Sequence, residues 1–289
     1  MDTIKTSFSD IIYKVKQDFK LTNSEIGSIL NCSESNISYY LSGKAQPSLD
    51  KGVLLKSFLE SKGSDIYSKY LFDYPSNDLL YHGSREGING RIIPNKSRRT
   101  NLDFGVGFYL GESFKQSSTF IAEEKSGKDR IYAFRFNQNN LRILKLEGLE
   151  WIFFVAYNRG KIPKNKENQK LINKMESFEN GGYDVICGPI ADDKMSMNME
   201  EFFSNNLTYG QILDCLTQLK VGDQYCLVTQ KACNRLKCIN IYFLDDTSRY
   251  LINEYASNKR DEAVEAARAI ASKSNDNGLK FEDLVKKYG

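Results

Sequence analysis

The sequence holds a single histidine, His82, a single tryptophan, Trp151, and only five prolines among 289 residues. No apolar run approaches the roughly 18 residues that a membrane-spanning helix needs, and residues 1–20 lack the continuous apolar stretch of a signal peptide. These absences exclude a membrane-spanning protein and argue against contact with a membrane. We therefore expect a cytoplasmic protein.

Paired cysteines and strong charge are also missing. The six cysteines form no Cys-x-x-Cys pair and lie in or beside apolar segments, which favours reduced thiols in the core over disulfides or zinc ligands. We expect no metal. The net charge of +3 is too small to indicate a polyanionic partner by itself, so any argument for nucleic acid has to come from a motif.

Two kinds of sequence pattern divide the chain. Residues 8–58 carry apolar side chains at helical spacing, with Thr22 or Asn23 and then Ser33 at positions that suit helix N-caps. After residue 71, helices alternate with short β-rich runs, and these are Leu79–Tyr81, Phe108–Leu110, Ile131–Phe136, Leu141–Leu146, Tyr183–Ile186, Tyr225–Val228 and Cys238–Phe243. We predict an α+β fold with an all-helical domain over residues 1–71, a linker at 72–78, a mixed domain ending at 245 and a helical tail over 246–289.

The stretch LTNSEIGSILNCSESNISYYLSGKAQPS, residues 21–48, places the apolar pair Ile26 and Leu30 on one helix and a polar start on the next. It resembles the helix-turn-helix domains of phage repressors and their bacterial relatives. In such domains the front of the second helix enters the major groove of DNA. The resemblance implies DNA contacts by Ser33, Ser35, Asn36, Tyr39, Tyr40 and Lys44.

The charge of this helical segment leaves a second interpretation open. Eight lysines stand against seven acidic residues up to Lys62, and a net charge of +1 is small for a surface that neutralises phosphates. A single domain of this charge should bind DNA weakly, so we expect a homodimer on a two-fold symmetric site. The alternative is a helical bundle that contacts other proteins.

His82 stands at the end of an apolar run, followed by Gly83 and Ser84. A lone histidine at a strand end is more often structural than catalytic, but its neighbourhood changes the balance. Downstream, Gly105 and Gly107 let the backbone approach a partner closely before a strand that carries Tyr109. This is not the G-x-G-x-x-G fingerprint of a dinucleotide-binding fold.

A helix expected over residues 112–122 carries Ser117 and Phe120. The rings of Tyr109 and Phe120 can flank a planar heteroaromatic group, while His82 and Ser117 hydrogen-bond its polar edge or an attached ribose. Ordinary core packing is the alternative for the two aromatic rings. The hydrophobic segment around Trp151 follows helical spacing and is predicted to be core.

Three stretches, LLYHGSR (residues 79–85), GVGFYL (105–110) and SFKQSSTF (113–120), resemble the signatures of poly(ADP-ribose) polymerases and diphtheria-type ADP-ribosyltransferases. The later stretches LEWIFFVAYNR, YDVICGPIADD and DQYCLVTQKA resemble an uncharacterised bacterial family placed in the same superfamily. Together the similarity covers residues 79–236. It implies a split β-sheet fold with NAD as the substrate and no metal.

The resemblance also assigns roles. His82 would bind the ribose next to adenine, the Gly83 backbone would pair with the nicotinamide amide with help from Ser117, and Tyr109 would stack on nicotinamide. Phe120 stands in place of the family's second tyrosine. The resemblance thus implies catalysis by His82, Tyr109 and Gln224, and NAD binding by His82, Gly83, Ser84, Gly107, Tyr109, Ser117 and Phe120.

Gln224 is the main departure, because the family has a glutamate at this position on a late strand. A carboxylate stabilises the positive charge that develops on the ribose, whereas a glutamine only orients the sugar. We therefore expect slow transfer, assistance from Asp223, Asp192 or Asp193, or an acceptor that needs little activation. A loop cap is the alternative for Asp192 and Asp193. Restoring the carboxylate with Gln224→Glu is expected to raise NAD cleavage.

The leading hypothesis is an NAD-dependent mono-ADP-ribosyltransferase, a toxin-type or regulatory enzyme, fused to a DNA-binding helix-turn-helix domain. Its macromolecular acceptor is not identified by the sequence, and a toxin would imply an antitoxin partner. The alternative is a non-enzymatic DNA-binding regulator whose C-terminal domain senses NAD or ADP-ribose. Weaker candidates for contact with the phosphates of NAD are Arg159 and the pair Arg98 and Arg99.

Overall fold

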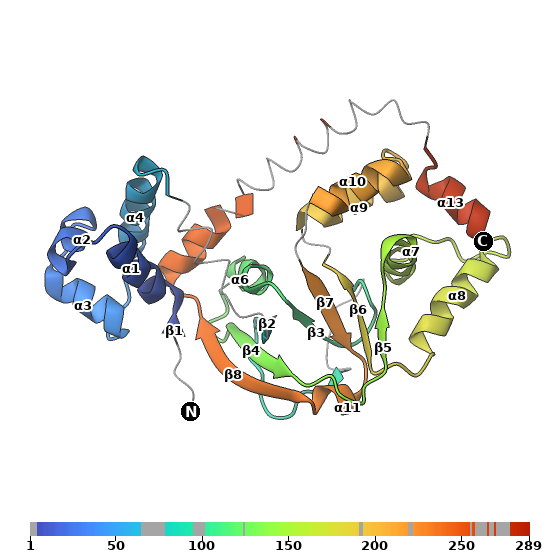
Figure 1. Cartoon of the computed structure of the whole chain (residues 1–289), viewed down its shortest axis with the longest axis horizontal. Helices are drawn as coiled ribbons and strands as arrows, with labels where there is room; N and C mark the ends of the chain where they lie inside the picture. Colours follow the sequence, from blue (N-terminus) through green and yellow to red (C-terminus); the bar gives the residue numbers. More distant parts are fainter. Residues whose placement is uncertain are drawn as a thin grey trace. The chain divides into compact units, whose positions relative to one another are not determined.

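The computed structural model describes residues 5–64, 79–94, 102–123, 125–190, 193–218, 222–254, 256–257 and 278–289, with the single residues 265 and 269. The predicted linker 72–78, Arg98, Arg99, Asp192 and most of the predicted tail helix at 259–272 lie outside this set. Across the described residues the fold is α+β with helices at the N-terminal end, as expected (Figure 1). None of the helices in this set is both long enough and apolar enough to span a bilayer.

The chain divides into two compact units, each assembled from separate stretches. The first unit comprises residues 1–89, 112–136 and 237–258, and the second comprises residues 90–111, 137–236 and 259–289. Each unit has its own apolar core. The sequence-based division at residues 71 and 245 remains a prediction.

Four helices open the first unit: α1 (Ser7–Asp18), α2 (Asn23–Ile29), α3 (Glu34–Ser42) and α4 (Leu49–Ser61). The predicted caps are confirmed. Thr22 begins α2, accepting a hydrogen bond from the Glu25 amide while the Glu25 carboxylate accepts one from the Thr22 amide at 2.7 Å. The Ser33 hydroxyl accepts from the Asn36 amide at 3.2 Å and begins α3. Such caps satisfy backbone groups that the first turn of a helix leaves without partners.

The strands of the first unit are β1 (Lys5–Thr6), β2 (Leu79–Ser84), β4 (Arg130–Phe136) and β8 (Leu236–Phe243), in the order β1-β8-β4-β2. β1 runs parallel to β8, and β2 runs antiparallel to β4. The expected strand Leu79–Tyr81 therefore continues to Ser84. His82 lies inside β2, opposite Tyr132, and its expected position at a strand end was wrong.

The helices and the strands of the first unit share one core. The ring of Phe114, on α6 (Phe114–Ala122), packs edge-on against Tyr81 and Tyr242, with centroids 5.4 and 5.3 Å away. Phe8 and Ile11 of α1 belong to the same buried cluster. Such aromatic contacts add to the free energy gained by removing apolar surface from water.

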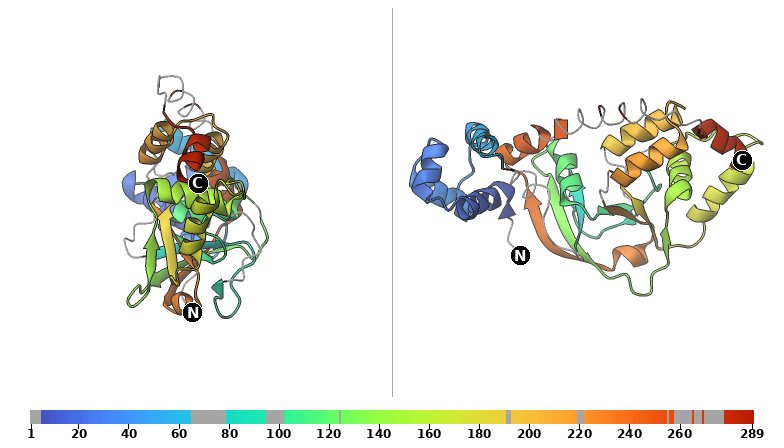
Figure 2. Two further views of the ribbon diagram at one scale, coloured as in Figure 1. Left: turned by 90° about the vertical axis from the view of Figure 1, so that its right-hand side faces the viewer. Right: turned by 45° about the horizontal axis from the view of Figure 1, so that its top comes forward.

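In the second unit, β3 (Phe108–Gly111), β7 (Asp223–Leu227), β6 (Val185–Pro189) and β5 (Ile143–Lys145) follow one another in that order. Its helices are α7 (Gly148–Asn158), α8 (Gln169–Glu179), α9 (Asp193–Phe203), α10 (Tyr209–Gln218), α11 (Gln230–Cys233) and α13 (Phe281–Tyr288). α9 and α10 lie side by side, and α13 contacts α8 and α9 (Figure 2). Trp151 and Phe154 on α7 are fully buried, so their predicted place in the core is confirmed.

All six cysteines are free thiols, as expected. Four of them are buried, Cys32 is partly buried, and Cys238 is exposed. The expectation of core thiols therefore holds for the second unit, where the four buried cysteines lie.

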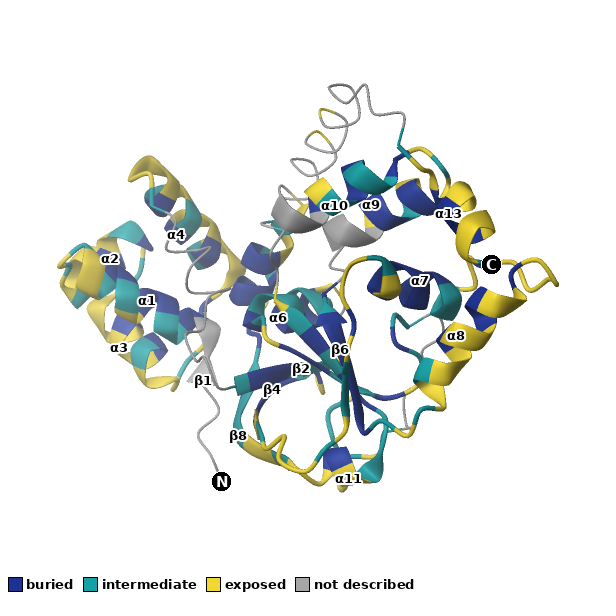
Figure 3. Ribbon diagram, turned by 45° about the vertical axis from the view of Figure 1, so that its right-hand side comes forward, coloured by how far each residue is buried: buried dark blue, intermediate teal, exposed yellow. Residues whose placement is uncertain are grey.

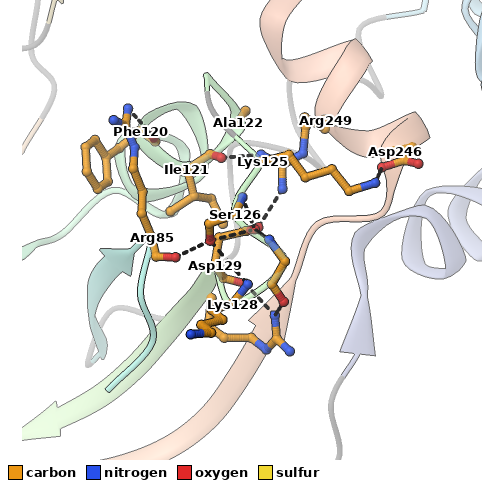
Figure 4. Close-up of polar contacts among 12 residues, drawn as sticks. Arg85, Phe120, Ile121, Ala122, Lys125, Ser126, Lys128, Asp129, Asp246 and Arg249 are labelled. Carbon is orange, nitrogen blue, oxygen red and sulfur yellow. Dashed lines mark hydrogen bonds and ion pairs between the residues drawn. The ribbon is translucent and has the colours of Figure 1, made fainter. Parts of the chain in front are cut away.

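A buried ion pair joins Arg249, in the helical residues 246–254, to Asp129, which directly precedes β4 (Figure 4). Arg249 contacts the carboxylate of Asp129 at 2.5 Å and donates a hydrogen bond to the carbonyl of Ile121 in the last turn of α6. The backbone amides of Ser126 and Gly127 also donate to Asp129. Burial works to raise the pKa of Asp129, but the hydrogen bond and charge of Arg249, together with backbone hydrogen bonds such as that from Ser126, outweigh it and hold that pKa below its usual value.

We expect Arg249→Leu to lower the free energy of unfolding by about 3–5 kcal/mol at neutral pH, because it leaves a buried carboxylate without its charged partner. Urea denaturation measures the loss. The difference from wild type should shrink as pH falls through the lowered pKa of Asp129, since protonation removes the ion pair from wild type as well.

Lys125→Ala is the matched control for this experiment. Lys125 and Asp246 form an ion pair whose side chains are 56% and 61% exposed, so its loss should cost less than about 1 kcal/mol. Equal effects of the two substitutions would contradict a stabilising role for the buried pair.

Candidate functional site

The sequence-predicted site residues fall into two groups, one in each unit. His82, Gly83, Ser84, Ser117 and Phe120 belong to the first unit. The second unit holds Gly107, Tyr109 and Gln224. Each group is built by a strand and the element that packs on it.

Gly83 allows α6 to pack closely on β2. A Cβ atom at this position would lie 2.7 Å from the carbonyl oxygen of Ser117 and 3.0 Å from Cδ1 of Phe120. Only glycine permits this approach. Gly83, Ser117 and Phe120 are therefore brought together, and the glycine has a packing reason that holds with or without a ligand.

His82 and Ser84 point to the other face of β2. Side chains alternate along a strand, and the two odd-numbered neighbours Tyr81 and Gly83 face α6. His82 and Ser84 therefore project away from the helix that carries Ser117, and both are partly exposed. The expected shared pocket of His82 and Ser117 is thus divided by the strand itself.

Arg85 occupies one face of the Phe120 ring. Its guanidinium carbon lies 4.5 Å from the ring centroid, and its Nη2 donates to the Phe120 carbonyl at 3.2 Å. The same nitrogen forms an ion pair with Glu123 at 2.9 Å, and Figure 4 shows Arg85 beside the Phe120 ring. A planar ligand that stacks on Phe120 has to use the opposite face or displace Arg85. The sequence pattern around Phe120 did not predict this partner.

The hydroxyl of Tyr109 closes the turn before β3. It donates to the carbonyl of Gly105 at 2.7 Å and accepts from the amide of Phe104 at 3.0 Å. Burial strongly raises the pKa of this phenol, so the hydroxyl stays neutral. Gly105 has a φ of +74°, a left-handed conformation that favours glycine. Tyr109 is therefore a structural residue of this turn as well as a candidate for stacking.

Gly107 allows the same turn to approach β7. A Cβ atom there would lie 2.3 Å from the sulfur of Cys226 and 3.0 Å from the carbonyl oxygen of Leu227. Strands β3 and β7 are antiparallel, with Tyr109 opposite Cys226 and Gly111 opposite Gln224. Because paired residues and their second neighbours share a face, the side chains of Tyr109 and Gln224 project from the same face of this strand pair.

Gln224 is 7% exposed and is held by two acceptors. Its Nε2 donates to Asp103 Oδ2 at 2.9 Å and lies 3.4 Å from the carbonyl oxygen of Pro189. The other oxygen of Asp103 accepts from Arg159, from Nη2 at 2.7 Å and from Nε at 2.9 Å. Arg159 also lies 3.7 Å from Glu200. A chain of polar contacts thus runs from Gln224 into the unit.

The sequence did not predict Asp103 as a partner of Gln224. It also suggested a different partner for Arg159. The guanidinium of Arg159 forms an ion pair with the carboxylate of Asp103, whereas the sequence had suggested contact with the phosphates of NAD. Of the acids expected to assist Gln224, Asp223 pairs with Lys145 at 3.7 Å and Asp193 is the first residue of α9. The sequence signal for Asp103 was its position directly before the turn that contains Gly105 and Gly107.

The candidate DNA-contacting residues Ser33, Ser35, Asn36, Tyr39 and Lys44 are all exposed, and the outer faces of α2 and α3 are exposed in Figure 3. Tyr40 differs. It is 7% exposed, and its ring packs edge-on against Phe8 at 6.0 Å. Tyr40 follows the helical period into the core, so its expected role in DNA contact was wrong.

Residues 79–238 match the model of a family described as a protein of unknown function, DUF3990. This match covers more than half of the 289 residues, and the chain belongs to this family. No curated protein and no solved structure matches the chain.

We expect Tyr109→Phe to lower the free energy of unfolding by about 1–3 kcal/mol, because it leaves the buried amide of Phe104 and the carbonyl of Gly105 without their partner. Thermal and urea denaturation measure the loss. Tyr13→Phe, at a 56% exposed tyrosine on α1, is the control and should change stability little. Wild-type stability of Tyr109→Phe would show that the hydroxyl is not needed for the turn.

Proposed function

We propose that this chain is an NAD-dependent ADP-ribosyltransferase. The observation that carries the proposal is the placement of Tyr109 and Gln224 on one face of the paired strands β3 and β7. An aromatic ring and a polar acceptor roughly 7 Å apart on such a face suit a planar group joined to a sugar. The resemblance of the surrounding motifs to ADP-ribosyltransferases supports NAD as that ligand.

The reaction breaks the bond between the nicotinamide nitrogen and the ribose. Nicotinamide leaves with the bonding electron pair, and the positive charge of NAD passes to the ribose ring. The acceptor then bonds to the same ribose carbon and releases a proton, and with water as acceptor the products are ADP-ribose, nicotinamide and a proton. Groups that stabilise the positive charge on the ribose accelerate this step.

The residues of this chain then take the following roles. Tyr109 stacks on nicotinamide, and the amide oxygen of Gln224 accepts a hydrogen bond from a ribose hydroxyl. For His82 and Gly83 the roles rest on the resemblance alone, which implies that His82 binds the ribose next to adenine and that the Gly83 backbone binds the nicotinamide amide. The resemblance adds Ser84, Gly107 and Phe120 to the residues in contact with NAD, with Arg85 beside Phe120. Ser117 is left out of this set, because it is buried on the opposite side of β2 from His82.

A second candidate function is a regulator that binds NAD or ADP-ribose without turnover. The uncharged amide of Gln224 favours it, because nothing at that position carries the full charge of a carboxylate. Binding without release of nicotinamide would distinguish this regulator from the transferase.

The exposed front of α3 supports a further part of the proposal, that α2 and α3 form a DNA-binding helix-turn-helix. Ser35, Asn36, Tyr39 and Lys44 present hydroxyl, amide and ammonium groups to solvent, which are the groups that bind phosphates and base edges. A transferase joined to a DNA-binding domain fits a toxin or a regulatory enzyme that acts on a macromolecular acceptor. Such an enzyme would be inhibited by an antitoxin partner and would bind DNA as a homodimer.

We expect wild-type protein incubated with NAD labelled in the adenosine ribose to release nicotinamide and to transfer label to water or to an added acceptor. His82→Ala should raise the dissociation constant for NAD by about tenfold through loss of one hydrogen bond, without unfolding the protein. Calorimetric titration and circular dichroism measure these two quantities.

Tyr13→Ala, far along the sequence and 56% exposed, is the matched control and should bind NAD as wild type does. Absence of both NAD binding and nicotinamide release from the wild-type protein would contradict the transferase and the regulator together.

For DNA, we expect the protein to bind its own promoter as a dimer with an affinity that falls steeply with salt. Ser35→Glu should weaken binding by about tenfold or more, because a carboxylate faces phosphate, while its position in the first turn of α3 keeps the helix stable. Ser61→Glu on α4 is the exposed control. A monomer that shows no preference for the promoter at low salt would count against DNA binding.

A further inference from the structure

The orientation of the Gln224 amide is determined by its two partners. The carboxylate of Asp103 and the carbonyl of Pro189 are both acceptors, at 2.9 and 3.4 Å. Only the NH₂ group can face them, because the amide oxygen donates no hydrogen bond. The oxygen Oε1 therefore points away from both acceptors, and Gln224 presents an acceptor atom where the resemblance places a glutamate.

The carboxylate of Asp103 divides its two oxygens between two partners. Arg159 binds Oδ1 with two nitrogens, and Gln224 binds Oδ2. The side chains of Asp103 and Arg159 are each 12% exposed, and electrostatic interactions are stronger in such surroundings than in water. The carboxylate of this ion pair contacts Gln224. The guanidinium of Arg159 lies on the other side of the carboxylate, 3.7 Å from Glu200.

We infer that Asp103 is a positioning residue for catalysis: it holds Nε2 of Gln224, turns Oε1 toward the ribose of NAD, and polarises the amide so that this oxygen carries more negative charge. The inference rests on the proposed function. Asp103 and Gln224 together then do what a single glutamate does in the resembling enzymes, orienting the sugar and offsetting its positive charge in the transition state.

This arrangement reverses the expectation for Gln224→Glu. A glutamate at position 224 would put a second carboxylate against Asp103 Oδ2 and the Pro189 carbonyl, with no donor among the three groups as long as both carboxyls are ionised. Two carboxylates at such a distance cannot both be charged without a large penalty. The single substitution is therefore expected to lower both the melting temperature and the rate of nicotinamide release.

The test exchanges the carboxylate of Asp103 and the amide of Gln224 between the two positions. We expect Asp103→Asn to lower kcat for nicotinamide release from NAD by about tenfold, with KM within about twofold of wild type, because the lost charge acts mainly in the transition state. In the double variant Asp103→Asn with Gln224→Glu, the asparagine NH₂ donates to the new carboxylate. This variant should melt at a higher temperature than Gln224→Glu alone and should recover at least the wild-type kcat.

Glu200→Gln is the matched control. It removes a carboxylate that faces the same arginine but is 44% exposed and lies on α9. Its kcat should stay within about twofold of wild type, as an exposed ion pair contributes little.

Three outcomes would overturn the inference while wild type still cleaves NAD: an Asp103→Asn kcat no lower than that of Glu200→Gln, a Gln224→Glu variant that is faster than wild type at unchanged melting temperature, or a double variant that regains stability without rate. The last result would assign Asp103 a structural role only. A wild-type protein that neither binds nor cleaves NAD would overturn the proposed function, and the catalytic role of Asp103 with it.

Discussion

The pairing of β3 with β7 is the constraint on which the candidate site depends. It places Gly111 opposite Gln224 and brings the turn before β3 against β7. This approach is so close that a side chain at Gly107 would collide with Cys226. Asp103 lies directly before that turn, and its contact with Gln224 joins residues 121 positions apart in the sequence. Without this close backbone approach, the carboxylate and the amide would not meet.

Glycine has a packing role in both groups of site residues, and this changes how the motifs are interpreted. Gly83 lets α6 lie on β2, and Gly107 lets a turn lie on β7. Neither position needs a bound ligand to explain it. The case for NAD therefore depends on the side chains that these approaches position, above all on Tyr109 and Gln224, and less on the glycines that mark the motifs.

Tyr109 combines two requirements that usually lie on separate residues. Its hydroxyl holds the turn at Phe104 and Gly105, while its ring lies on the face of the strand pair that also carries Gln224. A ligand that stacks on this ring would meet a side chain already immobilised by two hydrogen bonds. Such preorganisation reduces the entropy lost on binding.

The sequence by itself determined the local structure of this protein. Helical periodicity located the N-terminal helices, the caps at Thr22 and Ser33 marked their starts, and seven short apolar runs located seven strands. These features depend on residues within a few positions of one another, so the order of residues along the chain is enough to predict them. The two-residue strand β1 is too short to leave such a pattern.

Only the tertiary structure decided which side chains meet. The direction of His82 follows from which face of β2 receives α6, and the partner of Gln224 follows from the pairing of distant strands. Arg85 on Phe120 and Arg159 on Asp103 are likewise contacts between residues 35 and 56 positions apart. Their geometry depends on chain packing, which no local spacing encodes, because a hydrogen bond or ion pair forms only when folding has brought both atoms within reach.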